Sequence, residues 1–269
     1  MVISAHFRDA GPNAVKAVEE LINLSVDSNI PVQISHLGSC AAVGYMKEAL
    51  LIIEKAKNKG VQVDTDCYPY VAFSTSIGSA VFDDGWREKM GKSYEDIILI
   101  EEPYRGVACN SKLFHEVRKN HPDMYVVASV MNEDEVIMAL KAPYMMVASD
   151  GTYNKGQGHP RGAGTFPRVL GRYVREMNEI SLLDALKKMT IYPARKLGIN
   201  SKGLIKETMD ADIVIFDPDK IIDQASFENP AVPPLGIDYV IVNGTIAVDH
   251  NHIVASRAGR FVKKSELSR

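Results

Sequence analysis

The chain has few cysteines, few aromatic residues and no long run of one charge. Its three cysteines, Cys40, Cys67 and Cys109, are an odd number at irregular spacing, which excludes a disulfide framework and is typical of a reducing compartment. Aromatic residues make up 7% of the chain and the formal net charge is −3. This composition gives no electrostatic reason to expect a nucleic acid or a membrane surface as a partner.

Long hydrophobic runs are absent as well. No apolar segment approaches the length of a membrane span, and the first residues lack the charged and hydrophobic regions of a signal peptide. With 269 residues, 46% of them hydrophobic, the chain can nevertheless bury a large core, in one big domain or two small ones. We therefore expect a soluble cytoplasmic protein that binds neither nucleic acid nor membrane.

What the sequence does contain is a pair of similar segments near its start, each ending on a histidine. Residues 2–6 (VISAH) and 32–36 (VQISH) are short β-branched runs, and the stretch between them, about 12–29, predicts one helix. This strand–helix–strand pattern places His6 and His36 at the same end of two parallel strands. Parallel α/β folds carry their chemistry at that end, and two neutral imidazoles there favour a zinc site.

The alternation of strands and helices continues to about residue 200. It predicts a helix over 43–59 that stops at Gly60, a strand over 61–70 that stops at Pro69, strands over 124–131 and 144–149, and helices over 133–141, 165–177 and 181–197, the last interrupted near Tyr192-Pro193. Between these elements, residues 71–122 are irregular apart from helical pieces such as 112–119. Such an excursion is typical of an active-site lid or an insertion.

After about residue 203 the pattern changes to short strands and turns. It predicts strands over 212–216, 239–242 and 245–248, the last two joined by a hairpin turn at Asn243-Gly244. We therefore expect a boundary near residue 200, with a partial (β/α) unit over 1–200 and a small β-rich module over 201–269.

A carboxylate joins the two histidines in the predicted site. Asp150 follows the strand at 144–149, so it is expected at the same sheet edge as His6 and His36. Two imidazoles and a carboxylate suit a hydrolytic zinc centre. Zinc lowers the pKa of bound water to about 7, and the carboxylate can accept its proton and pass it to a leaving group.

A series of short motifs covers nearly the whole chain. They are His6-Phe7-Arg8, Ile34-Ser35-His36-Leu37, Asp66-Cys67-Tyr68-Pro69-Tyr70, Ala148-Ser149-Asp150-Gly151, His159-Pro160-Arg161-Gly162, Gly164-Thr165-Phe166-Pro167-Arg168-Val169-Leu170-Gly171, Thr190-Ile191-Tyr192-Pro193-Ala194, Ala211-Asp212-Ile213-Val214-Ile215-Phe216-Asp217-Pro218 and Val242-Asn243-Gly244. Each motif alone is weak. In their order and spacing, however, they resemble the C-terminal part of the N-acyl-D-amino-acid deacylases (D-aminoacylases) of the amidohydrolase superfamily.

The resemblance implies an α/β fold: the C-terminal half of a (β/α)8 metallohydrolase barrel, strands five to eight with an insertion at about 71–122, followed by a small β-sandwich module. It implies that His6 and His36 are ligands of a zinc ion and that Asp150 is both the general acid/base and a ligand of a second metal position. The implied activity is zinc-dependent hydrolysis of the amide bond of N-acyl-D-amino acids or related small amides.

The same resemblance implies a substrate-binding group. Tyr68, Ser74 and Arg161 match positions that grip the substrate carboxylate in the family. A guanidinium fork suits a carboxylate, and the phenol and the hydroxyl can add hydrogen bonds to it.

The sequence departs from the family pattern in two places. The family has a lysine two residues after the second histidine, where this chain has Gly38, so a cationic contact to the substrate is lost. The family also has a His-x-His pair on strand one and a metal-bridging cysteine, and neither precedes His6 here. Strands one to four are therefore expected to be absent, with the zinc site incomplete.

Each predicted site residue also has a structural interpretation. His6 and His36 could be hydrogen-bonded histidines at strand ends, and Asp150 an ordinary turn residue before Gly151. Arg161 lies in a glycine-rich segment that could be a linker, while Tyr68 and Ser74 could be packing and loop residues.

Two function classes remain open from the sequence. The first is an enzyme with the deacylase activity above, and a related cyclic-amide hydrolase is a weaker variant of it. The second is a truncated, catalytically incomplete chain, active only with a complementing half or not at all. Half a barrel would leave sheet edges unpaired, so we also expect a homo-oligomer or association with a missing N-terminal half.

Overall fold

The computed structural model describes residues 1–154, 156–254 and 257–262, and part of the expected β-rich module, residues 255–256 and 263–269, lies outside them. The chain folds as two compact units. The first consists of Met1–Thr165 and Ala225–Val232, and the second of Phe166–Gln224 and Pro233–Arg269. The predicted site residues all belong to the first unit.

The first unit is built on a parallel sheet. Its strands are β1 (Ile3–Ala5), β2 (Val32–Ile34), β3 (Val63–Cys67) and β8 (Met145–Val147), in the order β1-β2-β3-β8. The expected α/β class is therefore confirmed. Within the described residues β1 and β8 each pair with one neighbour only, so this sheet is open and is not closed into a barrel.

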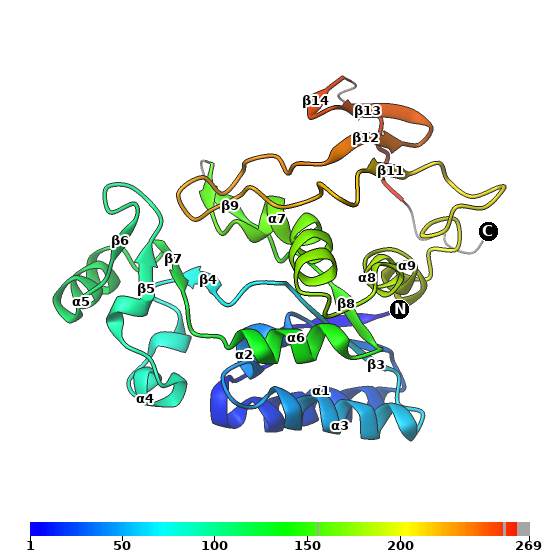
Figure 1. The fold of residues 1–269 in the computed structure, drawn as a ribbon. Coiled ribbons are helices and arrows are strands. Elements are labelled where there is room, and N and C mark those ends of the chain that lie inside the picture. Colours follow the sequence, from blue (N-terminus) through cyan, green and yellow to red (C-terminus); the bar gives the residue numbers. More distant parts are fainter. Residues whose placement is uncertain (155, 255–256, 263–269) are drawn as a thin grey trace. The chain divides into compact units, whose positions relative to one another are not determined.

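Helices connect successive parallel strands, as the alternating pattern predicts. They are α1 (Ala14–Ser28), preceded by η1 (Gly11–Asn13), then α2 (Leu37–Ala41), α3 (Met46–Asn58) and α6 (Glu133–Lys141). Helix α1 buries Val18, Leu21 and Ile22 on one face and ends at Asn29, whose φ of 54° closes the helix in the left-handed region. Helices α1 and α3 run side by side (Figure 1).

Residues 73–128 form a second, antiparallel sheet with its own helices, which we call the inserted module. Its elements are β4 (Phe73–Ser76), η2 (Ala80–Phe82), α4 (Trp86–Met90), η3 (Tyr94–Asp96), β5 (Ile97–Leu99), β6 (Val107–Ala108), α5 (Ser111–Asn120) and β7 (Tyr125–Ala128), with the strand order β4-β7-β5-β6. The helix expected at 112–119 is α5. The strand expected at 124–131 is β7, and it pairs with β4 and β5 rather than with the parallel sheet.

Buried aromatic rings form the core of the inserted module. Phe82 packs edge-on against Trp86 and Phe114 and stacks on Phe73, with ring centroids 5.5–6.0 Å apart. These rings come from four separate elements, so their burial holds the module together. The short β9 (Tyr153–Asn154) and β10 (Gln157–Gly158) follow β8 and form a hairpin.

The helices after residue 160 differ in detail from the sequence expectation. They are α7 (Arg161–Arg168), the π-helical η4 (Val169–Glu176), α8 (Leu182–Met189) and α9 (Ile191–Leu197). The break expected near Tyr192-Pro193 falls at Thr190, where φ and ψ are −125° and −81°. Pro193 instead lies in the first turn of α9, where its missing N–H removes no helical hydrogen bond.

The second unit contains the expected short strands. They are β11 (Ile213–Phe216), β12 (Ile237–Val242), β13 (Thr245–Asp249) and β14 (His252–Ile253), and all are antiparallel in sequence order. The β12–β13 hairpin turns at Asn243 and Gly244, whose φ values of 50° and 78° are those of the predicted tight turn.

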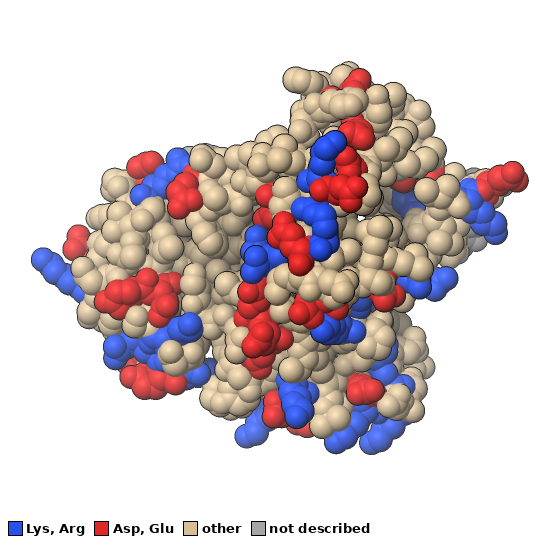
Figure 2. Space-filling view, in the orientation of Figure 1, with Lys and Arg blue, Asp and Glu red and all other residues tan. Residues whose placement is uncertain are grey.

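The surface agrees with the mixed charge of the sequence. On the face shown in Figure 2, the basic and acidic side chains of the described residues are interspersed rather than grouped by sign. None of the helices in the described part of the chain combines the length and the apolar character that crossing a membrane requires.

Candidate active site

The six predicted site residues line one cavity of about 490 Å³ in the first unit. They come from distant parts of the sequence and meet beyond the carboxyl ends of the parallel strands. His6 and His36 follow β1 and β2, Tyr68 follows β3, Ser74 lies on β4, Asp150 follows β8, and Arg161 begins α7. The topology therefore brings together the residues that the sequence pattern singled out.

The two histidines face each other directly. His6 Nδ1 lies 3.0 Å from His36 Nε2, and the ring centroids are 4.7 Å apart. Two nitrogens bound to one tetrahedral zinc at about 2.0–2.1 Å would lie about 3.3 Å apart, so the observed pair is close to a zinc-ligand arrangement. The donor set and its spacing fit zinc.

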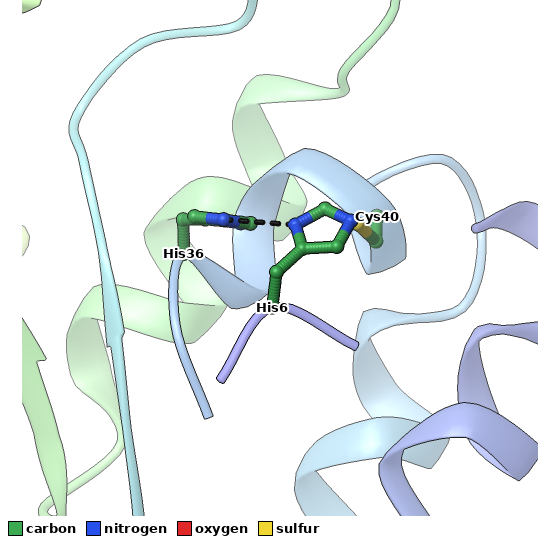
Figure 3. Close-up of side chains that lie close together, drawn as sticks. All are labelled: His6, His36 and Cys40. Atoms are coloured by element: carbon green, nitrogen blue, oxygen red, sulfur yellow. Dashed lines mark hydrogen bonds between the residues drawn. The ribbon is translucent and has the colours of Figure 1, made fainter. Parts of the chain in front are cut away.

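A third ligand atom lies beside this pair. The ligand atoms of His6, His36 and Cys40 all lie within 4.8 Å of one another (Figure 3). Cys40 is buried on α2, and burial raises the pKa of its thiol to about 11. Cys40 was not among the ligands predicted from the sequence. Its position four residues after His36 is the sequence signal that could have suggested a ligand role.

His36 is held in an unusual backbone conformation. Its φ of 39° lies in the left-handed region, and its N–H donates to Asp66 Oδ1 at 2.7 Å. Asp66 also accepts a hydrogen bond from Gln33 Nε2 at 2.6 Å, and its burial on β3 raises the pKa of its carboxyl group. Left-handed non-glycine residues typically store strain at functional sites, and Asp66 compensates for it here. Sequence reasoning missed this supporting role of Asp66.

The protonation of His36 is shaped by its surroundings. Burial lowers its pKa, the negative charge of Asp150 opposes that shift, and His6 adds to it. The balance favours the neutral imidazole, which is the form that binds a metal.

Asp150 follows β8, which is separated from β2 by β3, and it has a similar left-handed conformation. Its φ is 47°, and its Oδ2 forms an ion pair with Arg161 Nη2 at 2.9 Å. The carboxylate is 41% exposed and lines the cavity. In the compact cluster of ligand atoms, however, the third member beside His6 and His36 is Cys40 rather than Asp150.

Arg161 carries hydrogen-bonding capacity that the protein does not use. Its side chain is only 6% exposed, and its Nε and Nη1 make no hydrogen bond among the described residues. The guanidinium stacks over the Tyr68 ring at 4.5 Å, and the buried Tyr68 hydroxyl also makes no hydrogen bond within 3.5 Å. Unpaired buried donors are costly in a finished protein interior, so they indicate a position for an anionic ligand.

His159 fixes the backbone of Arg161. Its Nδ1 accepts the Arg161 N–H at 3.0 Å, and its Nε2 therefore carries the proton and donates to the Ala72 carbonyl at 3.0 Å. His159 is fully buried. It connects the start of α7 to the segment before β4, where Ser74 lies.

The inserted module forms one wall of the cavity. It contributes Ser74, Thr75 and Lys89, and Lys89 on α4 forms an ion pair with Asp9 in the loop after β1. The chemistry-bearing residues thus lie at the parallel strand ends, and the facing wall comes from a separate sheet.

Comparison with known proteins agrees with this arrangement. The Amidohydrolase family model matches residues 139–248. A D-aminoacylase from Alcaligenes xylosoxydans xylosoxydans is 30% identical over 277 residues, which cover 98% of this chain and 55% of that protein.

Two solved structures are similar to this chain over most of its length. A D-aminoacylase with a binuclear metal centre superposes with a TM-score of 0.84 and 31% identity, covering 96% of this chain and 55% of that one. An N-acyl-D-glutamate deacylase from Bordetella bronchiseptica, complexed with zinc and a phosphonate inhibitor, superposes with a TM-score of 0.80 and 30% identity, covering 92% and 54%. The chain therefore spans about half the length of the relatives it matches.

Proposed function

Because the chain belongs to the D-aminoacylase family of the amidohydrolase superfamily, we propose that it carries the catalytic carboxylate and the substrate-binding residues of a zinc-dependent deacylase. The substrates would be N-acyl-D-amino acids or related small amides. The observation that carries this proposal is the meeting of His6, His36, Asp150 and Arg161 in one cavity.

The proposal includes the architecture of the family. Strands β1, β2, β3 and β8 would be strands five to eight of a (β/α)8 barrel within residues 1–200, and residues 201–269 would form the sandwich module. The agreement with D-aminoacylase structures at a TM-score of 0.84 supports this assignment.

In this proposal His6 and His36 hold a zinc ion, with Asp150 available as a further ligand. Bound there, zinc would polarise the amide carbonyl and make water a better nucleophile near neutral pH. The neutral state that burial favours for His36 suits this role.

Asp150 moves the proton. As water adds to the amide carbonyl, the Asp150 carboxylate accepts a proton from it and then passes that proton to the amide nitrogen as the C–N bond breaks. The products are a carboxylic acid and a free amino acid. The Asp150 carboxylate is partly exposed in the cavity, beside the Arg161 guanidinium, so a bound substrate can reach it.

Arg161 binds the carboxylate of the substrate. Its unpaired Nε and Nη1 can donate two parallel hydrogen bonds to a carboxylate, and the Tyr68 and Ser74 hydroxyls can add to them. This contact would hold the acylated nitrogen at a fixed distance from Asp150.

The alternative is a catalytically incomplete chain. Its motivation is the open parallel sheet, in which β1 and β8 each leave one edge unpaired among the described residues. Unpaired edges attract additional strands. In this alternative, activity would require a complementing half or the association of copies of this chain.

An activity assay separates the two proposals. The purified chain is supplied with zinc, and release of the free amino acid from N-acetyl-D-amino acids is compared with release from their L counterparts. Turnover that is lost in Asp150→Asn but kept in Asp134→Asn, an exposed carboxylate on α6, supports the deacylase. Stoichiometric zinc without turnover supports the incomplete chain, and turnover without any bound metal would contradict the zinc mechanism.

A further inference from the structure

We propose that Cys40 is a third protein ligand of the metal ion held by His6 and His36, so that this chain contains a three-ligand N₂S site of its own. The inference deepens the proposed function, because it concerns the same metal position. It assigns a thiolate where sequence reasoning expected only imidazole and carboxylate ligands.

The ligand atoms of His6, His36 and Cys40 lie close to one another. The three ligand atoms lie within 4.8 Å of one another, and the two histidine nitrogens are already 3.0 Å apart. In a tetrahedral zinc site with Zn–N of about 2.0–2.1 Å and Zn–S of about 2.3 Å, a nitrogen and a sulfur ligand lie about 3.6 Å apart. The observed separation of up to 4.8 Å therefore exceeds the tetrahedral nitrogen–sulfur distance by about 1 Å.

Cys40 lies on the short helix that directly follows His36. His36 is the residue before α2, and Cys40 lies four residues later, in the single turn of that helix. This short link keeps the two side chains close, and their ligand atoms lie within 4.8 Å of each other. In Figure 3 the His6 ring lies between the His36 ring and the Cys40 side chain.

Hydrogen bonds to Ser39 fix the orientation of the His36 ring. Ser39 Oγ donates to the His36 carbonyl at 2.9 Å, so it accepts the proton of His36 Nδ1 at 2.8 Å. That bond leaves the lone pair of His36 Nε2 facing His6 Nδ1. Metal-binding histidines usually have their second nitrogen fixed in this way.

The two facing nitrogens cannot both present lone pairs at 3.0 Å, because the lone pairs would repel. Either the Nδ1–H proton of a neutral His6 or a metal ion lies between them. The Cys40 sulfur lies within 4.8 Å of a ligand nitrogen of each histidine, and Ser39 Oγ lies 3.4 Å from that sulfur. An N₂S set leaves one tetrahedral position open, as catalytic zinc sites do.

Cobalt(II) provides a direct test, because a thiolate bound to cobalt gives a charge-transfer band in the near ultraviolet that nitrogen and oxygen ligands do not give. The full chain is freed of metal with a chelator and titrated with CoCl₂. We expect one cobalt per chain, with visible d–d bands and the charge-transfer band. In Cys40→Ala and Cys40→Ser the charge-transfer band should disappear, and cobalt affinity should fall by about 10-fold or more.

A matched variant keeps the test independent of the fold of the Cys40 variants. In Cys67→Ala/Cys109→Ala the only thiol left is Cys40, and the charge-transfer band should remain at full intensity. A wild-type chain that binds cobalt with d–d bands but without the charge-transfer band would overturn the role of Cys40 and leave the histidine site and the proposed function standing. Absence of stoichiometric cobalt binding would overturn both.

Discussion

Replacement of Arg161 by methionine should make the protein more stable while removing substrate binding. The guanidinium has two buried nitrogens without hydrogen-bond partners, and each such donor costs about 1–3 kcal/mol. Against this, the substitution loses an ion pair with the 41% exposed Asp150, worth about 0–1 kcal/mol, and a buried stacking contact with Tyr68, worth about 2 kcal/mol. The Arg161 N–H bond to His159 is kept, because it comes from the backbone.

The balance favours Arg161→Met by on the order of 1 kcal/mol. For a chain of this size that corresponds to a rise in Tm of about 2–4 °C, measurable by calorimetry or circular dichroism. If the unpaired donors serve a substrate carboxylate, kcat/KM for N-acyl amino acids should fall by about 100-fold, the value of two charge-assisted hydrogen bonds.

Arg168→Met is the matched control. Arg168 pairs at 3.1 Å with Asp223, whose side chain is only 5% exposed. Removing this guanidinium takes an ion-pair partner away from a buried carboxylate, so the same substitution should lower stability by about 1–3 kcal/mol. A fall in Tm of Arg161→Met as large as that of Arg168→Met would refute the reasoning, because it would mean that Arg161 is a structural residue.

Three further outcomes follow from the site and its supports. Asp150→Asn should reduce deacylation by about 10²- to 10⁴-fold, measured by amino-acid release, and metal analysis should still find the zinc held by His6 and His36; an unchanged rate would refute the role of Asp150 in moving the proton. Burial lowers the pKa of His36, so below about pH 6.5 the unfolded chain binds a proton more readily than the folded chain, and the free energy of unfolding should fall as pH decreases through that value. Urea denaturation at several pH values tests this, and His36→Gln should show a smaller decrease. Buried Glu135 accepts hydrogen bonds from the N–H groups of Gly44 at 2.6 Å and Met46 at 3.1 Å, at the start of α3. Glu135→Ala should therefore lower the free energy of unfolding by about 1–3 kcal/mol, and Glu135→Gln should lower it by less. Equal effects of the two substitutions would exclude a charge-specific role.

The parts of the fold that follow from local periodicity could be predicted from the sequence. The helices α1, α3 and α6 and the strands ending near His6 and His36 lie where the apolar spacing indicates. The hairpin turn at Asn243-Gly244 is also as predicted, because a tight turn with two positive φ values favours these residues. The convergence of six predicted residues on one cavity follows from parallel strand topology and from the family resemblance.

Features that depend on long-range pairing were not predictable in the same way. The strand over Tyr125–Ala128 looks in sequence like any buried strand, and only the pairing with β4 and β5 places it in the antiparallel sheet. The π-helical turns of η4 have no signal in apolar spacing. The role of Asp66 in holding His36 depends on a contact across 30 positions of the sequence, which no local pattern shows.

The inserted module has a consequence for how the cavity of such a fold can diversify. Its sheet has its own strand order and aromatic core, and it meets the cavity only through a wall that includes Ser74, Thr75 and Lys89. The module starts after β3 and returns before α6, so its exchange between related proteins leaves the strand ends that carry His6, His36 and Asp150 in place. Recombination at these two junctions would therefore change one wall of the cavity while keeping the residues at the strand ends.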